Sequence, residues 1–225
     1  MSRDFAFNEF WYLVLALRWT VLLSLVAFLG GAIFGLAIAV MRAGTIAPLR
    51  WAMAGFIQLF QGTPVLMQLF LVYYGISVLF GVRLDPWPAV TLAFTCYAAA
   101  FLGEIWRGCI QSIPAGQWDA ARALGLGWGV TMAKIVLPQA LRISIPATIG
   151  FLVQLVKGTS IAAIIGFVEL TRAAQVVNNS TFSPLTVYAL VAAIYFSLCW
   201  PLSRWADRLE RRLGKHQIAR VQAQI

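Results

Sequence analysis

Five apolar runs, each long enough to cross a bilayer, limit what this chain can fold into. A helix crosses the roughly 30 Å of membrane hydrocarbon with about 20 apolar residues. Only 11% of the 225 residues are charged, whereas soluble domains carry about 25%. Backbone N–H and C=O groups inside a bilayer must be paired within the protein, so the runs should be helices. We predict an all-α membrane protein, with one domain over 1–225 and about five spans near 19–41, 56–80, 88–110, 143–167 and 186–206.

The basic residues orient these spans. Lysine and arginine gather in the first and third loops and in a basic tail at about 207–225, whereas the second and fourth loops balance arginine against acid. Basic loops lie on the cytoplasmic side, and five spans put the termini on opposite sides. We therefore expect the N-terminus outside and the C-terminus in the cytoplasm. This topology accounts for the net charge of +9 and leaves no need for a nucleic-acid partner. The loop residues that decide the orientation are Arg42, Arg50, Arg107, Arg122, Lys134 and Arg142.

The cysteines and the histidine do not suggest a metal or catalytic site. Cys96, Cys109 and Cys199 lie in or beside apolar runs without paired CxxC spacing, and the one histidine, His216, lies in the tail. The chain also lacks a GxxxxGK[ST] loop, so we expect no ATP binding or hydrolysis by this chain. Met1–Phe10 has no basic n-region, so no cleavable signal peptide is expected.

The third loop, about 111–140, is a polar, small-residue-rich interruption of an apolar chain. Ser112 and Pro114 indicate a helix start, and Gly125 is placed to end that helix in a left-handed conformation. Alanine side chains there allow another backbone to approach closely, and Asp119 can meet a partner's cation or amide. The residues alone leave two possibilities open, a docking site for a partner and a surface helix packed on its own chain.

A second segment of the same loop runs from Trp128 to Leu137. Its apolar side chains fall roughly on one face, with Thr131 and Lys134 elsewhere. We expect it to lie along the membrane surface until Pro138 stops it.

Ionisable residues inside a membrane are costly and are candidates for function. Lys157, deep in the fourth span, suits a gate or a substrate-facing position, and equally a structural pair or a lysine that reaches the interface. Glu104 and Arg107 are spaced i,i+3 on the third span, which favours a structural ion pair.

Gly62-Thr63-Pro64 interrupts the second span. A proline kink explains this sequence, and so does a broken helix that lines a cavity. We favour a kink that lines the cavity over direct contact with substrate. The predicted residues of the translocation path or gate are Gly62, Thr63, Pro64, Gln154, Lys157, Thr159 and Ser160.

Small residues recur in two of the spans, which favours close packing between helices. They are Gly30, Gly31 and Gly35 in the first span, and Ala98, Ala99 and Gly103 in the third.

Asp119-Ala120-Ala121, then Gly125, then Ile135-x-Leu137-Pro138 is similar to the EAA loop of bacterial ABC-importer permeases. Asp119 stands where that family usually has glutamate. Over roughly 15–210 the chain resembles the subfamily of histidine, glutamine, arginine and glutamate/aspartate permeases. The motifs that carry this resemblance are Gln61-Gly-Thr-Pro64, Gln68-Leu-Phe70, Glu104-Ile-Trp-Arg-Gly108, Ser112-Ile-Pro-Ala-Gly-Gln117, Ala123-Leu-Gly-Leu126, Leu137-Pro-Gln-Ala140 and Lys157-Gly-Thr-Ser160.

The resemblance implies a transmembrane permease of a bacterial inner-membrane importer, carrying a polar amino acid or an analogue. A second permease subunit, identical or different, would pair with it. Two cytoplasmic ATPases would hold ATP and magnesium, an extracytoplasmic binding protein would deliver the ligand, and this chain would bind no cofactor itself. The coupling helix seated in the ATPase would comprise Gln117, Trp118, Asp119, Ala120, Ala121, Arg122, Ala123, Leu124 and Gly125.

Two alternatives belong to other functional classes. An ion-coupled secondary transporter predicts an internal repeat with broken helices in both halves, and the sequence shows no convincing repeat. A non-transporting assembly subunit explains the spans but not a solvent-side helix of this composition.

Overall fold

The computed structural model describes residues 5–222, with side chains over 5–213. All regular secondary structure in that part of the chain is helical. Four helices are long and apolar enough to cross a membrane, and a sharply bent pair makes a possible fifth. The expectations for Met1–Phe10, for His216 and for the tail at 207–225 fall partly or wholly outside the described residues.

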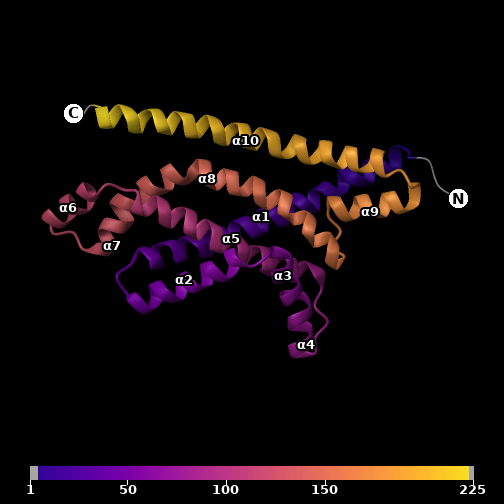
Figure 1. Cartoon of the computed structure of the whole chain (residues 1–225), viewed down its shortest axis with the longest axis horizontal. Helices are drawn as coiled ribbons and strands as arrows, with labels where there is room; N and C mark the ends of the chain where they lie inside the picture. The colour runs from indigo at the N-terminus through magenta and orange to yellow at the C-terminus, as the bar shows by residue number, and fades with distance from the viewer. Residues whose placement is uncertain (1–4, 223–225) are drawn as a thin grey trace.

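The long helices lie side by side along one axis (Figure 1). The short helices α6 and α7 form one end of the molecule, where α10 also ends, and α4 projects sideways. The elements are α1 (Phe7–Ala43), α2 (Ala47–Gly62), α3 (Val65–Phe70), η1 (Leu71–Gly75), α4 (Ile76–Phe80), α5 (Pro86–Gln111), α6 (Ala115–Ala123), α7 (Trp128–Thr131), η2 (Met132–Val136), α8 (Leu137–Gly158), η3 (Thr159–Ile165), α9 (Leu170–Thr181) and α10 (Pro184–Gln222).

The second span, expected near 56–80 with an interruption at Gly62-Thr63-Pro64, is sharply bent at that motif. The chain turns by 105° between Ala47–Gly62 and Val65–Phe80. Pro64 has no N–H to continue the helix and disfavours helical geometry at the residue before it. Thr63 accordingly lies in the extended region, with φ −119° and ψ 144°. Of the two alternatives, a proline kink and a broken helix, the structure therefore shows the broken helix.

The expectation that Pro138 stops the second loop helix was wrong. Helical structure runs from Trp128 to Ile165 without a break. A π-turn over Met132–Val136 widens the helix, and the Leu137 N–H donates to the Met132 carbonyl five residues back. Pro138 then occupies the first turn of the renewed α-helix, where no proline N–H is required.

The small residues of α1 and α5 do pack closely, as predicted. A Cβ added to Gly31 would lie 2.4 Å from the Ala98 Cβ, and one added to Gly103 would lie 2.9 Å from a methyl carbon of Ile38. A Cβ added to Gly35 would lie 3.0 Å from the Ala99 carbonyl oxygen. These contacts let the two backbones approach more closely than larger side chains would allow.

The two largest hydrophobic cores share α1. The larger core contains Leu23 and Ala27 of α1 and packs them with α5, α8 and η3. A smaller core contains Leu13 and Ala16 and packs them with α9 and α10. With 37 residues, α1 is roughly 55 Å long, well beyond the roughly 30 Å of hydrocarbon.

Candidate functional site

Helix α6 is attached to the body of the protein by one face. Ala121 is 1% exposed and Ile113, just before the helix, is 4% exposed. Trp118 packs against the larger core, and Gln139 of α8 donates to the Gln117 side chain at 3.4 Å. Of the predicted coupling residues, Ala121 and Trp118 therefore point inward.

The opposite face of α6, here called the free face, is exposed in the described structure. Gly116, Ala120 and Ala123 follow at helical spacing and are all exposed, and Leu124 is 77% exposed. Gly125 has φ +71°, the left-handed conformation expected of it. The free face is thus narrow and small, with one exposed leucine at its end.

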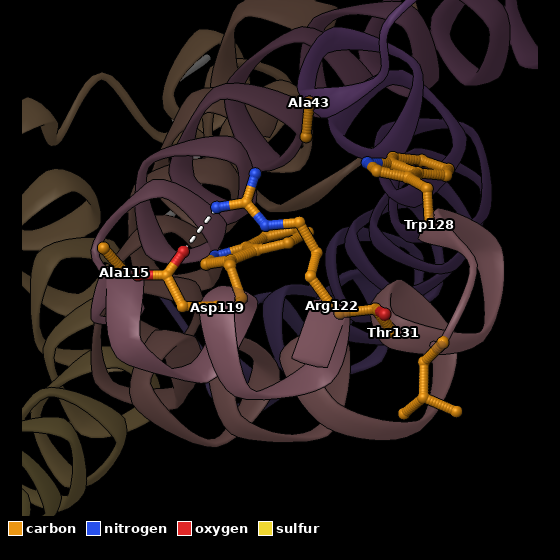
Figure 2. A pocket seen from close by; sticks show the side chains of 8 residues that line it. Ala43, Ala115, Asp119, Arg122, Trp128 and Thr131 are labelled. Carbon is orange, nitrogen blue, oxygen red and sulfur yellow. Dashed lines mark hydrogen bonds and ion pairs between the residues drawn. The ribbon is translucent and has the colours of Figure 1, made fainter. Parts of the chain in front are cut away.

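A cavity of about 500 Å³ separates α6 from the end of α1 and from α7. Figure 2 shows Asp119 and Arg122 extending over it from α6, with Ala43 opposite and Trp128 at its side. Asp119 pairs with Arg122 one turn along the same helix. Because both side chains are exposed, this pair stabilises the helix only slightly and leaves both groups open to a partner.

The break between α2 and α3 is held together by Gln68. Its side-chain nitrogen donates to the Phe60 carbonyl at 2.8 Å, and to the carbonyl and hydroxyl oxygens of Thr63 at 3.0 and 2.9 Å. The Thr63 hydroxyl donates to the Leu59 carbonyl at 2.7 Å. The carbonyls of Leu59, Phe60 and Thr63 at the break are therefore paired, while Gly62, Thr63 and Pro64 remain exposed.

Gln68 also has a free acceptor. Its side-chain oxygen is buried without a hydrogen-bond partner in the described part of the chain. From the sequence, Gln68 was predicted only as part of a motif. A glutamine one turn after a Gly-Thr-Pro break was the available signal, since a long amide reaches back to exposed carbonyls.

Gln154 and Lys157 share the exposed face of α8. The Gln154 amide donates to the Tyr97 hydroxyl of α5 at 3.4 Å. Lys157 makes no ion pair with any described side chain. Because α5 and α8 run in opposite directions, the Tyr97–Gln154 contact puts Glu104 and Lys157 roughly 15 Å apart along the helix axes.

Thr159 and Ser160 lie where α8 tightens into the 3-10 helix η3. Thr159 is fully buried and donates to the Val156 carbonyl at 2.7 Å, and Ser160 donates to the Lys157 carbonyl at 2.8 Å. Both hydroxyls therefore serve the backbone. Helix η3 packs against α3, so the structure brings this segment next to the break in the second span.

Glu104 and Arg107 form a two-point ion pair on α5. Arg107 Nε lies 2.8 Å from Glu104 Oε2, and its terminal nitrogen contacts the other oxygen. Arg42 of α1 approaches the same carboxylate at 3.8 Å. Glu104 thus ties α5 to α1.

Comparison with known proteins identifies the family to which this chain belongs. The family model described as "Binding-protein-dependent transport system inner membrane component" matches residues 31–215. The chain belongs to this family. It is a membrane-embedded permease subunit of an ABC transporter, and ATP hydrolysis resides on a separate chain. Permeases of this family work with an ATPase and a binding protein.

Individual relatives match almost the whole permease. A probable amino-acid ABC transporter permease of Bacillus subtilis (strain 168) is 34% identical, covering 96% of this chain and 95% of its own. The L-cystine transport system permease of the same organism is 35% identical, covering 95% and 92%. A crystal structure of an amino acid ABC transporter with histidines has 32% identity and a TM-score of 0.85, covering 94% of this chain and 100% of that chain. A methionine ABC transporter in an inward-facing conformation, at 23% identity and a TM-score of 0.77, shares the fold.

Proposed function

We propose that this permease carries a polar amino acid or a close analogue across the bacterial inner membrane. The relatives support this substrate class, since they are named for amino acids in general, L-cystine, glutamine, nopaline and arginine. The ligand would arrive from an extracytoplasmic binding protein. ATP and magnesium would be held by partner ATPases, with no cofactor on this chain.

A second permease subunit would complete the path. Helix α4 supports this pairing because it projects from the bundle (Figure 1) with Val78, Leu79 and Phe80 exposed by 82%, 79% and 72%. Such a surface suits lipid or another permease far better than water.

The observation that carries the proposed coupling role is the free, small-residue face of α6. Gly116, Ala120 and Ala123 allow an ATPase groove to approach the helix backbone, while Trp118 and Ala121 anchor α6 to the core. Movement of the ATPases would then pass to α5 and α8 through a helix that follows α5 in the chain and is hydrogen-bonded to α8. ATP shifts the population of conformations by binding one of them more tightly.

The proposed path runs along the exposed face of α8 and the break after α2. Gln154 and Lys157 present polar groups there, and Gly62, Thr63 and Pro64 form the adjacent exposed turn. The hydroxyls of Thr159 and Ser160 donate to the backbone carbonyls of Val156 and Lys157, so they are not free to contact a ligand as donors.

Uptake into proteoliposomes tests the proposed function. The permease is reconstituted with its ATPase and binding protein, and radiolabelled amino acids are supplied outside with ATP inside. We expect uptake that requires ATP hydrolysis and the binding protein. Uptake that persists with a non-hydrolysable ATP analogue, or that follows an ion gradient instead, would overturn the proposal.

Substituting the free face of α6 tests the coupling role. Ala120→Asp with Ala123→Asp places two carboxylates against the ATPase groove without touching the core, and should lower ATP-dependent uptake at least tenfold. Pull-down of the ATPase and stimulated ATP hydrolysis are measured alongside. Ala133→Asp, an exposed alanine of η2, is the matched control. Equal uptake by the double variant and the control would contradict the coupling role.

A further inference from the structure

A basic pocket lies where α1 ends, α2 begins and α5 ends. It consists of two adjoining hollows of about 160 and about 300 Å³, both lined by Arg42, Arg50 and Gln111. Arg107 lines the smaller hollow. Three guanidinium groups from three helices therefore meet around one space.

The charges in this pocket do not balance. Arg107 occupies both oxygens of Glu104, and Arg42 lies 3.8 Å from one of them. Arg50 forms no ion pair with a described side chain. Among the described residues, this one carboxylate accompanies three guanidinium groups, which leaves a net charge of about +2 around the pocket for an anion to neutralise.

Arg42 carries an unused donor. Its Nε is buried without a hydrogen-bond partner in the described residues, an arrangement that is costly unless a ligand supplies an acceptor. Arg50 stands in the first turn of α2, where Ile46 provides no side-chain cap and no acidic residue is present. The free N–H groups of that turn also favour an anion.

The surroundings of the pocket are those of a membrane interface. Trp51 is 72% exposed and Ile46 is 62% exposed, and the α1–α2 turn lies toward the same end of the molecule as α6 (Figure 1). Exposed tryptophan is typical of the headgroup level of a bilayer. An anion held here would therefore have apolar surface beside it.

We propose that this pocket binds the phosphate headgroup of an anionic phospholipid on the cytoplasmic side. The guanidinium groups of Arg42 and Arg50 donate to phosphate oxygens, and the acyl chains lie along Trp51 and Ile46. Basic pockets between helices on this side of a membrane are suited to such headgroups. The exposed apolar residues at the pocket favour a lipid over free phosphate.

Native mass spectrometry of the permease–ATPase complex tests this site. Phosphatidylglycerol or phosphatidylcholine is titrated into the detergent-solubilised complex, and bound lipid is counted. Arg42→Gln and Arg50→Gln should each weaken phosphatidylglycerol binding about fivefold, with little effect on phosphatidylcholine. Arg142→Gln, an exposed cation on α8, is the control for loss of general positive charge. Arg50 is exposed, so its substitution keeps the test valid if Arg42→Gln impairs folding.

Three results would overturn the proposal. Unchanged phosphatidylglycerol binding in both variants, or an equal loss in Arg142→Gln, would show that this pocket does not bind the lipid. Displacement of the lipid by millimolar inorganic phosphate, with equally tight phosphate binding, would make it a soluble-anion site. Loss of ATPase from the variant complexes with unchanged lipid binding would make it a protein-docking site.

Discussion

Glu169 is a buried acid that forms no ion pair with any described side chain. It is fully buried at the start of α9, accepts from the Arg172 N–H at 2.8 Å and accepts from the Tyr195 hydroxyl of α10 at 3.0 Å. The next residue, Leu170, donates its N–H to the Thr20 hydroxyl of α1 at 3.1 Å. This group of hydrogen bonds joins the three helices of the smaller core.

Glu169 should make stability depend on pH. Burial raises the pKa of its carboxyl above the ordinary 4.5, against the lowering effect of its hydrogen bonds. When the pKa is raised in the folded protein, the stabilisation is complete below the pKa of the unfolded state. It is lost as pH rises through the pKa of the folded state. The melting temperature should therefore fall less between about pH 5 and about pH 8 in Glu169→Gln than in the wild type. Glu210→Gln, an exposed acid, is the control, and a Glu169→Gln slope equal to the wild-type slope would contradict this role.

Gln68 should stabilise the break between α2 and α3. Gln68→Leu leaves the carbonyls of Phe60 and Thr63 without their donor, which should cost about 1–3 kcal/mol. Thermal unfolding in detergent measures this loss. Gln58→Leu, an exposed position on α2, makes the same chemical change without touching the break. Equal stability of the two variants would show that the amide does not hold the break.

Single residues were the hardest part to predict from the sequence. Lys157 and the Glu104–Arg107 pair stand out because charge in an apolar run is conspicuous. Glu169 does not, since it follows a span and resembles a loop acid balanced by Arg172. Its burial depends on Thr20 and Tyr195, which are far away in sequence and are brought together only by the fold.

The close contact between α1 and α5 gives a prediction for whole elements. Gly31→Ala places a methyl group 2.4 Å from the Ala98 Cβ, and the resulting overpacking should cost about 1–3 kcal/mol. Gly55→Ala in α2, with no atom within 4 Å of the added Cβ, makes the same substitution without a clash. Melting temperatures of the purified variants compare them. If Gly31→Ala were as stable as Gly55→Ala, α1 and α5 would accommodate the added methyl group without a loss of stability.

Elements were predicted well where composition decides them and poorly where hydrogen-bond register does. The small-residue stripes of α1 and α5 and the left-handed Gly125 were visible as patterns. Pro138 and Pro64 carry the same local signal, yet one lies in a continuous helix and the other turns the chain by 105°. The difference is the π-turn over Met132–Val136, which shifts the hydrogen bonds ahead of Pro138.

At the scale of the whole molecule, the family and the approximate number of spans were predictable from the sequence. Both depend on summed features, namely apolar length and several motifs along the chain. The division of α1 between the two largest cores was not predicted, because both parts of α1 read as apolar helix and their packing partners are set only by the fold.

This division has a consequence for synthesis at the ribosome. The first third of α1 emerges early, yet its packing partners α9 and α10 are made last, so most of the chain is translated before that third can pack. In a chain ending after Gly166, hydrogen–deuterium exchange should be fast over residues 7–18, which then lack α9 and α10. Exchange should be slow over residues 23–41, because α5 and α8 are still present in that chain. Equal protection of both stretches would show that the first third of α1 is stable alone. Fast exchange over 7–18 would show that the first third of α1 is protected only after α9 and α10 have been made.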